Sequence, residues 1–474
     1  MAIDSGAIWE VRTGGSDNNG GGFNPQRTFA GTDYSLQDAA QVVIDGTTIS
    51  AAVHTTTSMI TLSGYTVNSD DIGNHVQITG GTATAGVYEI TTIDDANNRW
   101  TLDRSAGTAA QTVVGNMGGA MASPARPLAY MVAGNTIFLK YSATPYEVTS
   151  TTANITDGRL DFNVSGSGTA RIHLHGYDTN RDISVNDANC PTIKAGASLG
   201  STVLVTLNNA NSFVSITNVI LDCNSRSGVG ALSIQGRCNY AKWVTAINGG
   251  GSAHVILIAN NAALLQCEVA DSTTNNYGGI YISSASAVVI GCVVRDHVGR
   301  AFDTNAQNAS SFRDCIAYNC SNATHGWGFY VQGSATNAFM NCVAFNCEAG
   351  GFRLQSADSF MACLNCVVTE NGGFGFGHNS LPMAMMLLNC AGYDNTSGNY
   401  PTGGTLPTII DFVALSGDPF TSTATDDFSL NSTAGAGADC KAAGIGPVGQ
   451  TSAIDIGAVQ SAGSGGSTVI VIED

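Results

Sequence analysis

A cysteine that returns at nearly constant intervals predicts the fold of this chain. Six of the nine cysteines between positions 267 and 390 recur at steps of 25, 23, 27, 24 and 24 residues. Turns rich in Asn, Gly and Ser lie between them, and no long helix-forming block interrupts the pattern. A repeat of this length builds one unit that buries its inner face only by stacking on its neighbours. The sequence therefore predicts an all-β protein, a right-handed parallel β-helix with three short strands per coil of about 24 residues.

The composition agrees with a solenoid. The chain has 474 residues, more than one ordinary compact domain, but a solenoid grows in one dimension and escapes the usual size limit. Charged residues make up only 11% and hydrophobic residues 43%, which is enough apolar surface to fold. The net charge is −18 and no Lys/Arg run exists, so nucleic-acid binding has no electrostatic basis.

The cysteine position marks one inward ladder. Stepping back from Cys267 by about 24 residues reaches Trp243, and a further step reaches Val219. Cys is a small apolar filler, and identical inward residues stack at the strand spacing of about 4.8 Å. The structural ladder is therefore predicted to comprise Val219, Trp243, Cys267, Cys292, Cys315, Cys342, Cys366 and Cys390.

A metal or redox site is the rival interpretation of the 13 cysteines. Cys363 and Cys366 have CxxC spacing, but within a strand of period two they fall on opposite faces or on separate sides of a corner. A zinc site also usually needs four close ligands. We predict a structural ladder, no metal site and no cofactor.

Five segments organise the chain. They are an N-terminal cap segment (1–31), an inserted small antiparallel β domain (32–117), the parallel β-helix (118–400), a C-terminal capping coil (401–460), and a Gly/Ser linker with a terminal strand (461–474). The insertion is favoured because residues 32–117 lack the coil period and carry hairpin turns at Gly80-Gly81 and Asn97-Asn98. The alternative is a run of irregular early coils.

Two separated segments carry a family resemblance. Ile8–Arg12 with Gly14–Gly20, and Ser123–Ala129 with Ala133–Leu139, resemble the two halves of the N-terminal signature of the pectate-lyase-like β-helix superfamily. The form they resemble is that of phage tailspike, fibre and virion proteins. In such proteins the halves usually lie close together and form the capped first coil. The resemblance implies a homotrimer with coils packed around a threefold axis.

The C-terminal end resembles the same group. Asp418–Phe420, Asp427–Leu430 and Asp455–Gln460 match its closing pattern, and we expect them to cap the last coil, whose open edge would invite aggregation. The terminal strand beyond the linker has the apolar run Val469, Ile470, Val471 and Ile472. This strand folds back on its own coil or adds to the sheet edge of a neighbouring subunit as a subunit contact.

Few residues suggest chemistry. The densest ionisable cluster lies between 295 and 303, and the catalytic candidates are Asp296, His297, Asp303 and Glu348. The alternative for Asp296 and His297 is a solvated turn between strands. No Walker motif, GxSxG elbow or HExxH motif is present. Aromatic residues cluster along one side of successive coils, and any outward rings could contact carbohydrate or a neighbouring subunit.

Three functions compete. The first is a structural or adhesive phage virion component: a fibre, spike or decoration protein that contacts other virion proteins and cell-surface polysaccharide. The second is a polysaccharide lyase or glycoside hydrolase of the tailspike depolymerase type. The third is a bacterial surface β-helix protein. Because Met1–Gly6 has no basic or apolar leader, we expect synthesis in the host cytoplasm and a place in the virion, or else outside the cell or on its surface. No membrane contact is expected.

Overall fold

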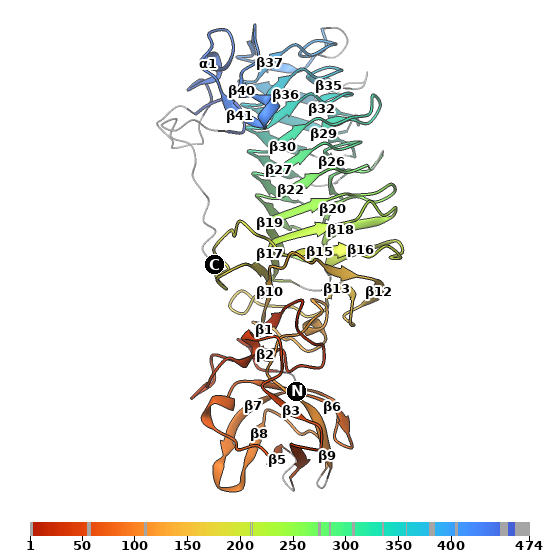
Figure 1. The fold of residues 1–474 in the computed structure, drawn as a ribbon. Coiled ribbons are helices and arrows are strands. Elements are labelled where there is room, and N and C mark those ends of the chain that lie inside the picture. Colours follow the sequence, from red (N-terminus) through yellow and green to blue (C-terminus); the bar gives the residue numbers. More distant parts are fainter. Residues whose placement is uncertain are drawn as a thin grey trace. The chain divides into compact units, whose positions relative to one another are not determined.

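The computed structural model confirms the all-β fold class, a parallel β-helix with a small antiparallel β domain near the N-terminus (Figure 1). Two compact units divide the chain, Met1–Gly200 with Leu204–Ile220 and Ser201–Val203 with Leu221–Asp474. No helix among the described residues is long and apolar enough to cross a membrane. The structure describes residues 3–54, 58–108, 111–208, 210, 212–273, 276–283, 286–305, 309–333, 336–356, 358–378, 384–402, 406–445 and 454–459.

The inserted domain is a closed antiparallel barrel. One strand, β9, pairs with both β4 and β6, and β5, β8 and β7 complete the ring between them. Inward residues alternate with outward ones, and Trp100 and Ile60 are fully buried at its centre. The strands are β3 (Val42–Ile44), β4 (Ser50–Val53), β5 (Met59–Ser63), β6 (His75–Gly81), β7 (Gly86–Asp94), β8 (Arg99–Leu102) and β9 (Thr112–Met117).

The two halves of the predicted N-terminal signature pair with each other. Strand β1 (Ile8–Val11) runs parallel to β10 (Thr136–Lys140), with Ile8 level with Thr136, and the barrel is inserted between them in the sequence. The other strands assigned to this region are β2 (Gly22–Phe23), β11 (Tyr146–Val148), β12 (Ser150–Ala153), β13 (Gly158–Phe162), β14 (Ile172–Tyr177), β15 (Thr192–Ala195), β16 (Thr202–Leu207) and β17 (Val214–Asp222).

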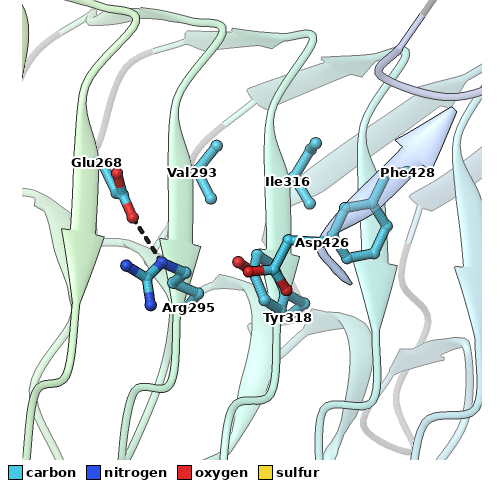
Figure 2. Close-up of a pocket in the computed structure, with 7 residues that line it drawn as sticks. All are labelled: Glu268, Val293, Arg295, Ile316, Tyr318, Asp426 and Phe428. Carbon is cyan, nitrogen blue, oxygen red and sulfur yellow. Dashed lines mark hydrogen bonds and ion pairs between the residues drawn. The ribbon is translucent and has the colours of Figure 1, made fainter. Parts of the chain in front are cut away.

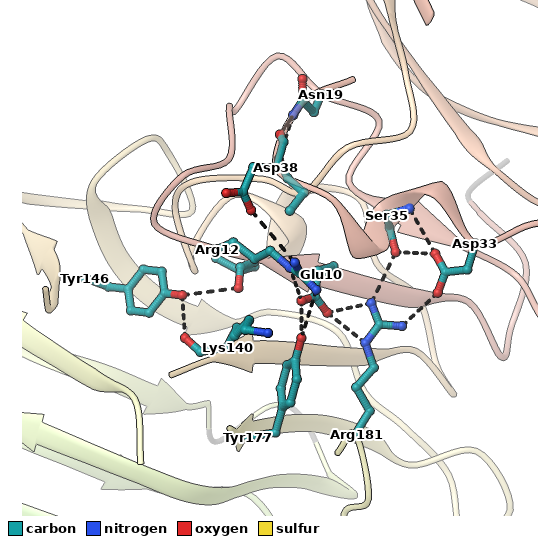
Figure 3. Close-up of polar contacts among 12 residues, drawn as sticks. Glu10, Arg12, Asn19, Asp33, Ser35, Asp38, Lys140, Tyr146, Tyr177 and Arg181 are labelled. Carbon is teal, nitrogen blue, oxygen red and sulfur yellow. Dashed lines mark hydrogen bonds and ion pairs between the residues drawn. The ribbon is translucent and has the colours of Figure 1, made fainter. Parts of the chain in front are cut away.

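A buried carboxylate holds this entry coil together. Glu10 on β1 is fully buried and accepts ion pairs from Arg12 at 2.7 Å and Arg181 at 2.6 Å. Tyr177 also donates a hydrogen bond to it, and Arg181 reaches on to Asp33 at 2.8 Å (Figure 3). Burial, reinforced by Glu10, raises the pKa of Tyr177 to about 12. Two guanidinium groups thus compensate one buried charge and join three segments distant in sequence.

Coils of the second unit stack three strand ladders. The first ladder contains β18 (Val229–Ile234), β20 (Ile256–Ile258), β23 (Ile280–Ile282), β26 (Phe302–Thr304), β29 (Trp327–Val331), β32 (Gly350–Leu354) and β35 (Phe376–His378). The second contains β21 (Ala263–Leu265), β24 (Val288–Ile290), β27 (Ser310–Arg313), β30 (Thr336–Met340), β33 (Phe360–Leu364), β36 (Ala384–Leu388) and β38 (Thr408–Ile410). The third contains β22 (Glu268–Ala270), β25 (Val293–Arg295), β28 (Ile316–Tyr318), β31 (Val343–Phe345), β34 (Val367–Thr369), β37 (Ala391–Tyr393) and β39 (Val413–Ala414). Strand β19 (Tyr240–Ile247) begins both the second and the third ladder.

One left-handed residue separates the second ladder from the third in every coil. Asn341, Asn365 and Asn389 occupy this corner with φ near +50°, a conformation that Asn tolerates, and each is followed by a buried cysteine. The six cysteines of the predicted ladder all lie on this inward position, exposed by 2% or less. Val219 is likewise buried directly after the left-handed Asn218.

Trp243 does not lie on the ladder. Thr245 is level with Glu268, so the residue beside Cys267 is Val244, which is fully buried. Trp243 instead occupies the corner itself, with φ of 55°, and its indole donates a 2.9 Å hydrogen bond to Gln266. The predicted ladder position was wrong by one residue. Coil lengths vary, so a fixed step of 24 residues does not always reach the residue after the corner.

Stacked aromatic rings fill the core opposite the cysteines. Phe302, Phe329, Phe352 and Phe376 stand on successive strands of the first ladder, and neighbouring rings stack at 4.7, 4.4 and 5.1 Å between centroids. These distances are close to the spacing of the strands that carry the rings. The next side chains on the same strands, such as Asp303 and Tyr330, therefore point outward, and Tyr281 is level with Asp303 on the preceding strand.

The C-terminal segment covers the side of the β-helix. A hairpin of β40 (Phe420–Ser422) and β41 (Asp427–Leu430) packs its Phe420 and Phe428 against Phe345 and Tyr318 of the third ladder. The main chain of Gly457 then donates to Asn365 O at 2.9 Å. The expectation that the closing segments cap the last coil needs correction, because the hairpin packs on the outer face of the third ladder, from Tyr318 to Leu415.

Truncating a ring within the aromatic stack should destabilise the β-helix. Phe329→Ala removes a fully buried ring that stacks on Phe302 and Phe352, and we expect a loss of about 3–5 kcal/mol in the free energy of unfolding. Phe29→Ala is the matched control, since this ring is 83% exposed and should change stability by less than about 0.5 kcal/mol. Urea denaturation of both variants measures the difference, and equal losses would contradict the stack as a core element.

Acid should destabilise the chain through His75. This imidazole is fully buried beside Trp9, 4.7 Å between ring centroids, and burial lowers its pKa to about 3. The unfolded chain has a histidine pKa near 6.5 and therefore binds a proton below that pH, whereas the folded chain does so only near pH 3. The free energy of unfolding contributed by His75 is therefore intact above pH 6.5 and is lost as the pH falls toward 3, by at most about 1.4 kcal/mol per pH unit. His75→Phe should flatten the pH dependence of stability in that window. His75→Gln serves as a second variant without an ionisable ring. If the free energy of unfolding of both variants depended on pH as in the unchanged protein, this assignment would be contradicted.

Candidate functional site

A groove lies on the outer face of the third ladder, beside the C-terminal hairpin (Figure 2). Its volume is about 410 Å³, within the usual range for small-ligand sites. The ladder supplies one wall and the hairpin the other. The lining residues are Glu268, Val293, Arg295, Ile316, Tyr318, Asp426 and Phe428.

The corner residue explains why these side chains face outward. After the inward cysteine the strand alternates, so the first and third residues point out and the second points in. Register stacks Glu268, Val293 and Ile316 in one outward row, and places Arg295 level with Tyr318 in the next. The groove is therefore built from two adjacent rows of the same ladder.

Arg295 is the central polar group of the groove. Its Nε lies 2.5 Å from Glu268 and its Nη1 lies 3.0 Å from Asp296. Burial alone would lower the pKa of Arg295, but the hydrogen bonds to Glu268 and Asp296 outweigh it and raise the pKa. The side chain is 30% exposed, and Nη2 makes no hydrogen bond to the described residues. A half-exposed guanidinium fixed at its inner edge presents donors to a ligand.

Tyr318 and Asp426 form the other end of the groove. Burial, reinforced by the adjacent Asp426 carboxylate, raises the pKa of Tyr318. The phenol therefore stays protonated at neutral pH and acts as a hydrogen-bond donor. Asp426 comes from the hairpin turn, in a left-handed conformation with φ of 57°. It reaches Tyr318 only because the C-terminal segment folds back over the ladder.

Asp296 occupies the second left-handed corner of its coil, at the end of the third ladder. Besides Arg295, it accepts a 3.1 Å hydrogen bond from Asn319, whose own oxygen accepts one from Asn346 at 2.8 Å. Asp296 thus lies beside the groove within a ladder of polar corner side chains.

His297 is fully buried, which overturns its interpretation as a solvated turn residue. Its Nε2 lies 3.1 Å from the carbonyl of Tyr277. Burial lowers the pKa of His297 to about 4, so the ring is neutral at physiological pH. The turn that carries His297 stacks on the equivalent turn of the preceding coil, where Ser272 is level with it, and both side chains are buried.

Asp303 stands on the first ladder, a different face from the groove. It is 1% exposed, pairs with Arg300 at 2.9 Å and accepts a 3.0 Å hydrogen bond from Gln332. Burial raises the pKa of Asp303, while Arg300 and Gln332 oppose that rise. The Arg300 guanidinium also lies 3.9 Å from the centroid of the Tyr330 ring. This compact arrangement leaves Asp303 out of reach of a ligand.

Glu348 lies apart from the other candidates. It follows β31, is exposed, and accepts a 2.5 Å hydrogen bond from the main chain of Asn322. Of the four catalytic candidates, the structure therefore places only Asp296 beside the groove, where it pairs with Arg295. Val469, Ile470, Val471 and Ile472 lie outside the described residues.

Some groove residues escaped the sequence analysis. Glu268 and Tyr318 stand at the first and third positions after a ladder cysteine, so alternation from the cysteine would have found them. Asp426 carries no such signal, because its position depends on the fold-back. Within the described parts of the chain, no group of three or more His, Cys, Asp or Glu side chains is arranged to hold a metal ion.

A family model and a solved pectate lyase structure agree with this fold. Residues 204–391 match the family model described as a right handed beta helix region. The solved pectate lyase Pel9A superimposes with a TM-score of 0.50 at 15% identity, covering 72% of this chain and 91% of that chain. The catalytic domain of a GH87 alpha-1,3-glucanase in complex with tetrasaccharides covers 82% of this chain and 95% of its own, with a TM-score of 0.31 at 8% identity. A comparison with curated proteins gave no match. At 15% identity the likeness to the pectate lyase concerns the fold alone.

Two aspartates should differ in their effect on stability. Asp303→Asn leaves Arg300 without its counter-charge where that arginine is only 14% exposed, and we expect a loss of about 3 kcal/mol or more. Asp296→Asn should cost less than about 1 kcal/mol, because this carboxylate is 39% exposed. Urea denaturation of the two variants measures the contrast. A stable Asp303→Asn protein would remove the structural explanation for this residue.

Proposed function

We propose that this chain is a glycan-binding β-helix protein, which takes a neutral, hydroxyl-rich segment of a polysaccharide in the groove beside the C-terminal hairpin. The observation that carries the proposal is the guanidinium of Arg295, which Glu268 and Asp296 hold while its Nη2 makes no hydrogen bond to the described part of the chain. An apolar wall, including Val293 and Ile316, lies next to it. Sugar rings offer both apolar faces and hydroxyl groups to such a surface.

Charge favours a neutral glycan. Three carboxylates, those of Glu268, Asp296 and Asp426, lie in or beside the groove with one arginine. The whole chain carries a net charge of −18. This field repels polyanions, whereas carboxylates accept hydrogen bonds from sugar hydroxyls. Binding of a uronic acid polymer is therefore disfavoured relative to a neutral one.

The proposed setting is an adhesive component of a bacteriophage virion: a fibre, spike or decoration protein assembled as a homotrimer with other virion proteins. Its support is the resemblance of the two chain ends to phage β-helix proteins. Light scattering of the purified chain tests the trimer, and capsid or tail genes beside its gene would support the virion. Placement outside the cell or on its surface is the competing setting.

Glycoside hydrolysis is the second candidate function. Hydrolases use two carboxyl groups, one as acid and one as base or nucleophile, on either side of the scissile bond. Glu268 and Asp426 line the same groove (Figure 2), and they are the groups we would assign to these roles. β-Elimination is less favoured, since it acts on a carboxylate-bearing sugar that the groove repels.

Loss of Arg295 should weaken glycan binding. On an array of neutral and uronic-acid oligosaccharides we expect the full chain to bind neutral glycans, and Arg295→Met to weaken binding about 10-fold or more, as for a lost charged hydrogen bond. Arg313→Met is the matched control, because Arg313 pairs with Asp314 outside the groove. Selective binding of uronic acids, or equal losses in both variants, would overturn the proposal.

The same glycans, assayed for new reducing ends, separate binding from hydrolysis. Product that disappears in both Glu268→Gln and Asp426→Asn would establish the hydrolase. Binding without product favours the adhesive function.

A further inference from the structure

The last coil of the β-helix is open on one side. Strand β38 pairs with β36 and β39 pairs with β37, and neither pairs with another strand on its far edge among the described residues. The core opens at the same place. Leu387 and Cys390 are fully buried, whereas Ile409 and Phe412, one coil further on, are only half buried.

Apolar side chains surround this open edge. Leu406 is 56% exposed and Ile410 is 44% exposed. The C-terminal hairpin does not cover them, because it packs on the outer face around Tyr318 and Phe345. An uncovered strand edge with apolar neighbours is a template for another strand.

We propose that the chain's own terminal strand, Thr468–Ile472, pairs with the free edge of β38 and covers the end of the core. This segment lies outside the described residues, but its composition is informative. Val469, Ile470, Val471 and Ile472 are all β-branched, and a Gly/Ser linker precedes them. It supplies both backbone partners for the edge and apolar cover for Ile409 and Phe412.

The length of the linker allows this pairing. Gly457 donates to Asn365 O at 2.9 Å, which fixes the chain at the corner of the β33 coil. Asp411 occupies the same corner two coils further on, next to β38. The free edge therefore lies about three strand spacings, or roughly 14 Å, along the axis from Asn365. The ten residues from 458 to 467 span up to about 33 Å when extended.

Tethering favours the same chain over a second copy. A short flexible linker holds its strand at an effective concentration in the millimolar range. A free copy at micromolar concentration is at least about 100-fold more dilute. The terminal strand therefore pairs within its own chain unless the linker cannot reach.

Hydrogen exchange of the full chain tests the pairing. We expect the amides of 468–472 to exchange at least about 10-fold more slowly than those of the linker, independently of protein concentration. A chain ending at Gln460 should exchange at least about 10-fold faster at Thr408–Ile410. The matched control deletes only Glu473 and Asp474, which keeps the strand and should preserve both protections.

Two results would overturn the proposal. One is exchange of 468–472 at the rate of the linker in the full chain. The other is protection that increases with protein concentration together with a larger mass by light scattering, because a second copy would then be the partner.

Discussion

The left-handed corner residue is the constraint on which the rest of the β-helix depends. It turns the chain between the second and third ladders while the strands remain in register, and residues such as Asn365 adopt it at little cost. The side chain after it points inward and the alternation that follows is fixed. Packing of the cysteines, outward display of Arg295 and Tyr318, and the place of the groove all follow from this one conformation.

Ionisable residues proved a poor guide to chemistry in this chain. Asp303 and Glu10 are both buried carboxylates paired with arginines. Glu10 joins segments distant in sequence through Arg181, and Asp303 contacts the next coil through Gln332. A buried pair is costly to break from one side, so such residues are retained for structure. The groove residue Arg295 differs in being fixed at one edge and open at the other. Partial exposure distinguishes it from the structural pairs more clearly than its charge does.

The fold was largely predictable from the sequence, and the candidate site only in part. The period of the cysteines indicates the coil, and the loss of that period indicates the inserted domain, because both are local patterns. Trp243 was misplaced by one residue, since the corner and not a fixed step sets the register. Arg295 and Asp296 were found as a cluster of charge. Asp426 could not be found, because no local pattern records a hairpin that folds back across four coils.

Insertion of the barrel between β1 and β10 has a consequence for the order of folding. The first coil cannot close until Thr136 reaches Ile8, which requires a loop of well over 100 residues. A barrel that folds first brings its own ends together and shortens the effective loop to roughly 50 residues. The entropic free-energy cost of closing the first coil then falls by about 0.8 kcal/mol. Early folding of the inserted domain, residues 42–117, therefore speeds nucleation at the N-terminal end of the solenoid.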